Sequence, residues 1–313
     1  MRFGAAFWIQ RTDWPDLRDA CLAAERAGWD TIWLDDHLLS DEASPDDPKL
    51  EGWASLHAVA SVTSRARLGL LVSSTTFRNP GVIAKLATTL DHVSAGRAVL
   101  GLGGGWFDRE HEAFGIDFGS GFGERLDRLD EATMLIRRLL DGERVTHQGR
   151  FFEMSDALCE PRPVQPRLPI LIGGSGKTKT LRTTARYADV WNAYGSPERF
   201  QELGAVLEGR CGEVGRDPAA IERTVTTHTV LRDTPGAAME IWQETARVHD
   251  LEGKLGSDGS DRGLTFGGPP ADFVDLVHRY QEAGLDEIIV VFRNPFDLET
   301  MERIGEVKAG LQG

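Results

Sequence analysis

Cysteine is scarce in this 313-residue sequence, and the three cysteines stand alone. Cys21, Cys159 and Cys211 lie far apart and form no C-x-x-C pair. A disulfide framework or a cysteine-based zinc site needs cysteines in pairs or at close spacing. We therefore expect three small, apolar thiols in a reducing compartment, which predicts a cytoplasmic protein.

Basic residues and long apolar runs are lacking too. There are 35 Lys and Arg against 49 Asp and Glu, which gives a net charge of −14 without a basic stripe. Binding to nucleic acid or to an anionic membrane surface is therefore not expected. The apolar run Phe3 to Ile9 is too short for a signal segment or a membrane span, which needs about 20 residues.

Signatures of metal and nucleophilic catalysis are absent as well. The sequence contains no H-x-H, H-E-x-x-H or G-x-S-x-G motif, and its eight histidines are dispersed. Asp36 and His37 could supply two metal ligands at most, so we expect no metal. His111 lies among acidic residues and is expected on a solvated loop.

What the sequence does contain is a β-prone run that ends in titratable groups, Asp30 to His37. Thr31 to Leu34 are typical of a parallel strand covered on both faces. Asp35, Asp36 and His37 follow at its carboxyl end, where α/β folds bind their ligands. A helix cap, an ion pair or a core histidine is the alternative interpretation of these three residues.

Seven further strands with intervening helices follow the same pattern. Gly28 and Gly96 end two of the helices, and Asn79-Pro80 begins another. Eight β–α units over this length predict a single (β/α)8 TIM barrel domain over residues 1–313, with excursions after strands four and seven. The expected strands are Arg2–Ile9, Thr31–Leu34, Ala66–Val72, Ala98–Leu102, Ile170–Ile172, Val190–Asn192, Arg223–Leu231 and Glu287–Phe292.

The excursions are expected to differ in kind. The first comprises a polar, glycine-rich segment through Gly123 and, beyond the helix Glu124–Leu140, a hairpin over Val145–Phe152. The second is a polar loop between Asp250 and Gly268, which is either an active-site lid or a simple excursion.

Two glycine clusters lie at strand ends. Neither completes a nucleotide-binding motif, because Trp106 and Leu171 occupy positions where glycine is required. The turn Gly173 to Gly176 nevertheless lies between a strand and a helix, so its backbone N–H groups can cradle a phosphate. The run Gly103 to Gly105 lets a flat ligand approach the backbone. The alternative for Gly173 to Gly176 is a tight turn without a ligand, and the alternative for Gly103 to Gly105 is a flexible loop.

The strand-end motifs together resemble those of the luciferase-like monooxygenase superfamily, in its branch that uses the deazaflavin coenzyme F420. These motifs extend over nearly the whole chain. They are Trp33-Leu34-Asp35-Asp36-His37, Phe77-Arg78-Asn79-Pro80, Ser94-Ala95-Gly96-Arg97, Gly101 to Trp106, Pro163-Val164-Gln165, Ile172 to Gly176 and Ala185 to Asn192.

The resemblance implies a cofactor lying across the mouth of the barrel. Its phosphate would rest on Gly173, Gly174, Ser175 and Gly176, and its ring would be backed by Leu71, Val72, Ser73 and Ser74. A non-proline cis peptide is expected within this second group. The remaining cofactor-binding residues would be Gly103, Gly104, Gly105 and Trp106.

The resemblance also implies catalytic roles for two residues. His37 would transfer a proton during hydride transfer, and Asp36 would orient or charge-stabilise its imidazole. Trp8, Trp53 and Trp191 are candidates for the wall of a substrate pocket, and core positions are the alternative. Trp106 replaces a glutamate that sugar-phosphate dehydrogenases of this branch carry, which disfavours a sugar-phosphate substrate.

Other functions stay open at this stage. An FMN-dependent monooxygenase with a separate reductase would use the same barrel. A catalytically silent flavin-binding protein is a further alternative, which the presence of His37 disfavours. A metal-dependent hydrolase is another, which the absence of metal-binding motifs disfavours. A small organic substrate is expected, and the family resemblance implies a homodimer.

Overall fold

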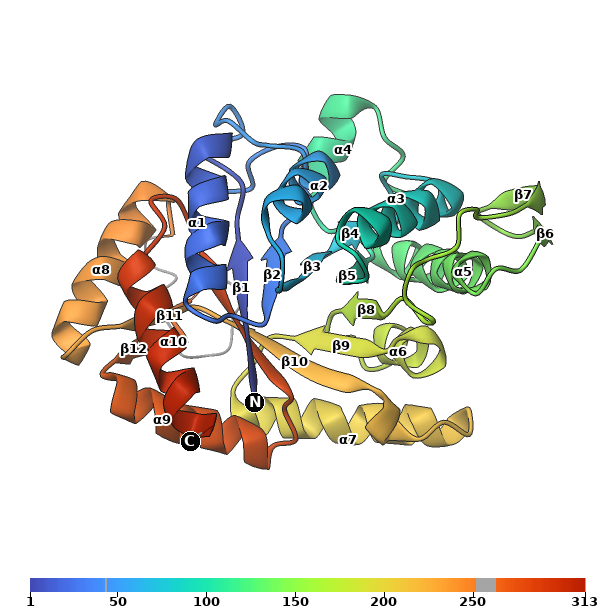
Figure 1. The fold of residues 1–313 in the computed structure, drawn as a ribbon. Helices are drawn as coiled ribbons and strands as arrows, with labels where there is room; N and C mark the ends of the chain where they lie inside the picture. Colours follow the sequence, from blue (N-terminus) through green and yellow to red (C-terminus); the bar gives the residue numbers. More distant parts are fainter. Residues whose placement is uncertain (43, 252–262, 313) are drawn as a thin grey trace.

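The fold is a closed barrel of eight parallel strands surrounded by helices, as the sequence predicts (Figure 1). The computed structural model describes residues 1–42, 44–251 and 263–312. Most of the loop expected between residues 250 and 268 therefore lies outside the described residues. No helix in the described ranges is long and apolar enough to cross a membrane.

The barrel strands pair in the order β1, β2, β3, β5, β8, β9, β10, β13, and β13 returns to β1. The first and last strands are thus neighbours in one sheet, because Arg2 to Phe7 pair in register with Glu287 to Phe292. The strands are β1 (Arg2–Phe7), β2 (Thr31–Leu34), β3 (Arg67–Leu70), β5 (Ala98–Gly103), β8 (Ile170–Gly173), β9 (Val190–Ala193), β10 (Glu222–Thr227) and β13 (Glu287–Phe292). The two-residue strand β4 (Ser73–Ser74) continues beyond β3 and pairs with β5.

Helices surround the barrel, and the short fourth helix lies at its mouth, beyond the carboxyl ends of the strands (Figure 1). The helices are α1 (Trp14–Arg26), α2 (Gly52–Val62), α3 (Pro80–Val93), α4 (Asp108–Phe114), α5 (Phe122–Leu140), α6 (Thr180–Tyr187), α7 (Pro197–Glu213), α8 (Pro235–Val248), α9 (Pro270–Glu282) and α10 (Leu298–Gln312), with a 3₁₀ turn at Pro218–Ala220.

The expected helix starts are seen in the structure. The side chain of Asp13 accepts a hydrogen bond from the backbone N–H of Asp16 and so caps α1. Asn79 caps α3 through the N–H of Gly81, with Pro80 in the first turn. Such caps satisfy N–H groups that have no partner within the helix.

Apolar side chains form two layers of core. Residues inside the barrel, among them Trp33, Val99 and Ile289, pack against one another. A larger cluster fills the space between the strands and the surrounding helices. The interior is therefore packed, and the space for a ligand lies at the carboxyl ends of the strands.

The excursions differ in part from the sequence expectation. The first contains the hairpin β6 (Val145–Gln148) and β7 (Glu153–Ala157), which projects beyond α5 in Figure 1. The polar, glycine-rich segment through Gly123 contains a short helix, α4, which the sequence analysis does not predict. The expected strand Arg223–Leu231 breaks at His228, since β11 (Thr229–Leu231) leaves the barrel and pairs with β12 (Phe266–Gly268).

Candidate active site

A cavity of about 380 Å³ opens at the carboxyl ends of the barrel strands. It brings together nearly all of the residues that the sequence predicts for cofactor binding. Those that line it are Leu71, Val72, Ser74, Gly103, Gly104, Gly105, Trp106, Gly173, Gly174, Ser175 and Gly176. Ser73 is fully buried behind the wall, where its hydroxyl donates to Asp36 at 2.9 Å.

The floor of the cavity depends on Val72. The peptide bond between Leu71 and Val72 is cis, within the segment where the sequence predicts one. The side chain of Val72 occupies a slot between Gly103 of β5 and Gly173 of β8. A Cβ atom on Gly173 would stand 3.0 Å from Val72, and one on Gly103 would collide with it. Glycine at both positions therefore lets Val72 sit between the strands.

The glycine turn after β8 is fixed from behind by Trp191. The indole Nε1 of Trp191 donates to the carbonyl of Gly174 at 2.9 Å, and the ring stacks on Phe200. The N–H of Gly174 donates to the carbonyl of Asn192 at 2.9 Å. Thr180, the first residue of α6, lines the cavity beside this turn. The turn thus presents backbone and a hydroxyl to the cavity, a combination suited to an anion.

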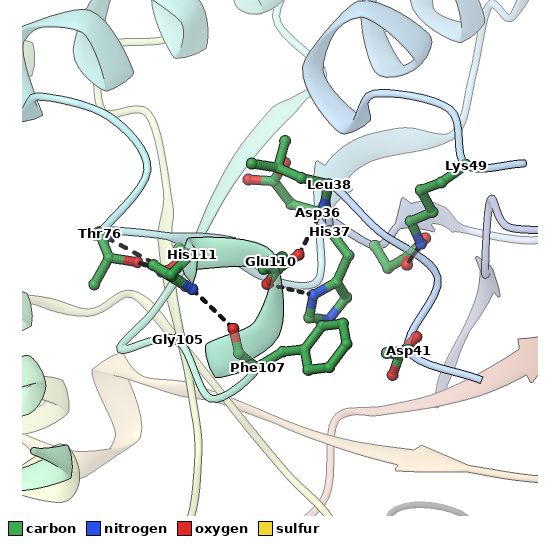
Figure 2. Close-up of polar contacts among 12 residues, drawn as sticks. Asp36, His37, Leu38, Asp41, Lys49, Thr76, Gly105, Phe107, Glu110 and His111 are labelled. Atoms are coloured by element: carbon green, nitrogen blue, oxygen red, sulfur yellow. Dashed lines mark hydrogen bonds and ion pairs between the residues drawn. The ribbon is translucent and has the colours of Figure 1, made fainter. Parts of the chain in front are cut away.

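His37 is held by a glutamate that the sequence analysis did not select. Glu110 lies on α4 and is buried, and its Oε1 is 2.9 Å from His37 Nδ1. Its other oxygen accepts the N–H of Leu38 at 2.8 Å. Figure 2 shows both bonds, with Asp41 on the opposite side of the imidazole. Because a carboxylate only accepts hydrogen bonds, Nδ1 carries a proton and Nε2 is left for a ligand.

The pKa of His37 is raised above its ordinary value. Burial by itself lowers the pKa of the imidazole, but the hydrogen bond that His37 donates to Glu110 and the negative charges of Asp41 and Glu110 outweigh it. The pKa of Asp41 is raised as well, chiefly by burial. The arrangement therefore favours the protonated ring more than in an ordinary histidine, as a proton donor requires.

Asp36 is not the partner of His37, so the expectation that it orients the imidazole is wrong. Its carboxylate accepts two hydrogen bonds from the guanidinium of Arg78, at 2.6 and 3.1 Å, and one from Ser73. Burial raises the pKa of Asp36, although Arg78 opposes the shift. Asp36 lines the cavity, but its hydrogen bonds tie β2 to the loop after β4. The side chains of consecutive residues in a strand point to opposite sides, so Asp36 and His37 meet different partners although they are adjacent in the sequence.

Asp35 has the structural role that the sequence suggests as one possibility. Its Oδ1 accepts the N–H of Ile9 at 2.8 Å, and its Oδ2 pairs with Lys49. These contacts join the ends of β1 and β2.

Two of the three tryptophans proposed as pocket walls lie elsewhere. Trp53 is a buried residue of α2 and donates to Ser73 at 3.1 Å, and Trp191 lies in the core behind the glycine turn. Neither lines the cavity, whereas Trp8 and Trp106 do. Trp106 is 52% exposed, and its ring meets His37 edge-on at 5.5 Å between centroids.

The expectation that His111 lies on a solvated loop is also wrong. It is 1% exposed, its Nδ1 is 2.8 Å from the carbonyl of Phe107, and its Nε2 is 2.6 Å from Thr76 Oγ1. His111 thereby attaches α4 to the loop after β4 (Figure 2). This attachment positions Glu110, its neighbour in the helix.

Two further charged residues of the cavity were missed. Arg293, directly after β13, forms a buried ion pair with Glu42, with nitrogen–oxygen distances from 2.7 to 3.0 Å. Its NH1 also lies 3.2 Å from Nδ1 of His228. The rule that selects Asp36 and His37, polar residues at the carboxyl end of a strand, would have selected Arg293. The sequence signal for Glu110 is weaker. Glu110 is an acidic residue in the first turn of a short helix that follows a glycine run.

The site combines three parts: a backbone cradle, an apolar floor at Val72 and an imidazole backed by a carboxylate. It can hold a flat ligand with an anionic group and can exchange a proton at His37 Nε2. No group of three or more His, Cys, Asp or Glu in the described ranges is arranged to hold a metal ion.

Residues 1–287 match the family model described as luciferase-like monooxygenase. An F420-dependent glucose-6-phosphate dehydrogenase of Kineococcus radiotolerans is 30% identical over 293 residues, which cover 87% of this chain and 86% of that protein. An F420-dependent secondary alcohol dehydrogenase, solved with an F420-acetone adduct, superposes with a TM-score of 0.81 at 20% identity, covering 98% of this chain and 97% of that one. A long-chain alkane monooxygenase superposes with a TM-score of 0.82 at 18% identity, covering 100% and 91%. At these identities the two structures show the fold alone.

Proposed function

Since the chain belongs to the luciferase-like monooxygenase family, whose model it matches over residues 1–287, we propose that it is a coenzyme F420-dependent oxidoreductase. It transfers a hydride between the cofactor and a small organic substrate. The observation that carries the proposal is the position of His37 Nε2, which faces the same cavity as the backbone cradle at Gly173 to Gly176. The names of several relatives at about 30% identity support the choice of cofactor.

The residues of the cavity fit such a cofactor. The slot formed by Gly103 and Gly173 holds Val72 where it would back a flat ring, and Leu71 lies beside it. The backbone of Ser175 and Gly176 would hold the phosphate in front of α6. A Cβ on Gly176 would stand 2.6 Å from the hydroxyl oxygen of Thr180, so a larger residue would fill the cradle.

The bound deazaflavin supplies the hydride chemistry, and because it lacks the ring nitrogen needed for ready oxygen chemistry, reduction or dehydrogenation is favoured over oxygenation. His37 performs the proton transfer that accompanies the hydride. Its protonated Nε2 donates to a substrate that gains a hydride, and its neutral Nε2 accepts from a substrate that loses one. Glu110 keeps the proton of Nδ1 in place throughout. Trp106 covers one side of the imidazole and reduces its contact with water.

A parallel titration tests the cofactor. Purified protein without cofactor is titrated with coenzyme F420 and with FMN while the fluorescence of each cofactor is followed. Saturable binding of F420 is expected. Binding of FMN alone would overturn the proposal in favour of an FMN-dependent monooxygenase.

The role of His37 has its own test. His37→Ala is expected to bind the cofactor as the wild type does and to lose about 10²- to 10⁴-fold in turnover, the usual contribution of a positioned acid or base. Unchanged turnover would make His37 a structural residue.

The remaining features of the proposal concern the whole chain. We propose one domain, which the pairing of β1 with β13 supports, and a cytoplasmic location, which three buried free thiols support. We also propose a homodimer. An outward row on α3 supports it, since Val82 and Val93 are 50% and 47% exposed and Leu86 lies between them. Light scattering at micromolar concentration checks the assembly.

A further inference from the structure

A run of hydroxyl-bearing side chains, residues 73–76, comprises β4 and the two residues after it. The hydroxyl of Ser73 donates to Asp36 behind the cavity wall. That of Thr75 donates to the carbonyl of Gly103 at 3.2 Å. Among these four residues, all of which the structure describes, Ser74 is the one that lines the cavity. Its hydroxyl is therefore the group of this run that a ligand can meet.

A chain of hydrogen bonds leads from Ser74 back to a buried histidine. Ser74 Oγ lies 2.6 Å from Thr76 Oγ1, which in turn lies 2.6 Å from His111 Nε2. On the other side of the imidazole, His111 Nδ1 lies 2.8 Å from the carbonyl oxygen of Phe107. We call these three bonds the His111 relay, and Figure 2 shows the two that involve the imidazole.

The carbonyl at its inner end gives the relay a direction. A carbonyl oxygen only accepts hydrogen bonds, so Nδ1 of His111 carries a proton. In the neutral imidazole Nε2 is then an acceptor, and the hydroxyl of Thr76 must donate to it. Because its own proton is used in this way, Thr76 Oγ1 accepts the hydroxyl proton of Ser74. The backbone N–H of Thr76 also donates to Ser74 Oγ, at 3.4 Å. What Ser74 has left for the cavity is a lone pair, which accepts.

The surroundings keep the relay in one geometry. His111 is 1% exposed, and its ring lies against those of Phe77 and Phe118, at 4.8 and 4.4 Å between centroids. Gly105 lies beside the relay with a φ of 75°, and a Cβ atom there would stand 2.7 Å from Ser74 Oγ. Glycine at this position therefore leaves room for the bond between Ser74 and Thr76, and the packed rings keep the imidazole from turning.

From this geometry we infer that His111 is a positioning residue for the cofactor: through Thr76 it fixes Ser74 as the hydrogen-bond acceptor for an N–H group of the bound ring. The inference rests on the proposed function. The pyrimidine part of a deazaflavin carries an N–H group flanked by carbonyl groups. A carbonyl facing Ser74 would bring two acceptors together and leave both without a proton, which costs binding free energy. The His111 relay thus selects the orientation of the ring in which the N–H group meets Ser74.

Two adjacent residues of α4 then set the hydrogen bonding of two groups at the cavity. Glu110 holds the proton of His37 on Nδ1, so Nε2 of that ring is left for proton transfer. His111 holds the proton of Ser74 on the side of Thr76, so Ser74 is left to accept. Proton transfer and recognition of the ring are thereby assigned to different side chains.

Nitrogen NMR of ¹⁵N-histidine-labelled protein without cofactor tests the direction of the relay. At neutral pH, His111 is expected to carry its proton on Nδ1, with Nε2 unprotonated and hydrogen-bonded. A proton on Nε2, or on both ring nitrogens, would overturn the inference. This measurement uses the wild type, so it decides even where a substitution prevents folding.

Variants at position 76 test the link between Ser74 and His111. Thr76→Val removes the hydroxyl, and the Nε2 resonance of His111 is expected to move toward that of an imidazole nitrogen without a donor. Thr76→Ser keeps the hydroxyl and should keep the wild-type resonance. Thr133→Val is the matched control, because it removes a hydroxyl that donates to the carbonyl of Leu129 on α5, outside the cavity wall. An unmoved resonance in a folded Thr76→Val protein would refute the relay.

Fluorescence titration with coenzyme F420 tests the contact with the ring. Ser74→Ala is expected to bind the cofactor about threefold to tenfold more weakly, the usual effect of one lost hydrogen bond. Thr76→Val should weaken binding as well, because Ser74 loses its fixed direction, and Thr76→Ser should bind as the wild type does. The double variant Ser74→Ala/Thr76→Val should bind no more weakly than Ser74→Ala, since the relay acts only through Ser74.

The outcomes of this titration are separable. Wild-type affinity in Ser74→Ala, or losses that add in the double variant, would refute the inference and leave the proposed function standing. A wild type that binds no coenzyme F420 would overturn the proposed function and the inference together.

Discussion

Replacing Glu110 by glutamine tests how the site controls the proton of His37. In the wild type, Glu110 accepts two hydrogen bonds, from His37 Nδ1 at 2.9 Å and from the N–H of Leu38 at 2.8 Å. Glutamine has one accepting oxygen and a donating NH₂ group. If the oxygen stays on Leu38, the NH₂ group faces Nδ1, and the neutral imidazole must move its proton to Nε2. The nitrogen that faces the cavity then can no longer accept a proton from a substrate.

The size of the effect follows from the bonds that change. Glu110→Gln replaces two hydrogen bonds to a charged acceptor, each worth about 1.5–3 kcal/mol. A carboxylate-to-amide change behind a catalytic histidine lowers turnover about 10⁴-fold where it enforces the wrong tautomer. We expect a loss of about 10²- to 10⁴-fold in turnover, with cofactor binding retained.

The pH dependence has a definite sign. The pKa of His37 is raised in the folded protein, so its contribution to stability is present below the ordinary imidazole pKa and is lost as pH rises through the raised one. Without the negative charge of Glu110, the effect of burial dominates, and the pKa of His37 is expected to fall. Glu110→Gln should therefore be less stabilised at acid pH than the wild type.

Nitrogen NMR of ¹⁵N-histidine-labelled protein provides the assay, since the two ring nitrogens report the tautomer and its titration without any substrate. Glu112→Gln, an exposed change on the same helix, is the control and should titrate as the wild type does. The reasoning would be refuted by a folded Glu110→Gln protein in which His37 keeps both the wild-type tautomer and the wild-type titration midpoint.

Three other predictions concern stability and the cavity floor. Burial alone would raise the pKa of Glu25, but hydrogen bonds from the backbone N–H groups of residues 64–66, at 2.7–3.1 Å, outweigh burial and lower that pKa. The contribution of Glu25 to stability is therefore present above the ordinary carboxyl pKa and is lost as pH falls through the lowered pKa. Glu25→Gln should cost about 1.5–3 kcal/mol at pH 7 and less at acid pH, which urea midpoints at several pH values will show. Burial raises the pKa of Glu287, so its contribution to stability is lost as pH rises through the raised pKa. Glu287→Gln should therefore gain stability relative to the wild type as pH rises above the ordinary carboxyl pKa, and a relative loss on that side would contradict the assignment. Gly103→Ala should displace the side chain of Val72 from the cavity floor and weaken cofactor binding at least tenfold. The control is Gly310→Ala, which has open space around it and should bind the cofactor as the wild type does.

The sequence predicts the barrel well because its signals are local and repeated. Each barrel strand is a short β-prone run between helix caps and glycine stops, and the eight runs can be counted without knowing their partners. Prediction of a strand through Leu231 was wrong because tertiary pairing decides where a strand leaves a sheet: residues 229–231 pair with 266–268, a partner far along the chain. The short helix α4 was missed because its helical signal is only seven residues long.

The site divides in the same way. Position at the carboxyl end of a strand selects Asp36, His37 and the two glycine clusters, and the structure gathers them around one cavity. Which acid meets which base is a different matter. Asp36 is adjacent to His37 in sequence, yet its carboxylate binds Arg78, and the imidazole meets Glu110, 73 residues away.

The sequence by itself thus determined the barrel, the edge at which the site lies and the residue types gathered there, since these depend on periodicity and on the direction of parallel strands. Only the tertiary structure decided the pairs that give the site its charge: Glu110 with His37, Arg78 with Asp36, and Glu42 with Arg293. Each pair joins segments held side by side by barrel closure and helix packing, and no local pattern records which distant side chain will fill the space beside a buried charge.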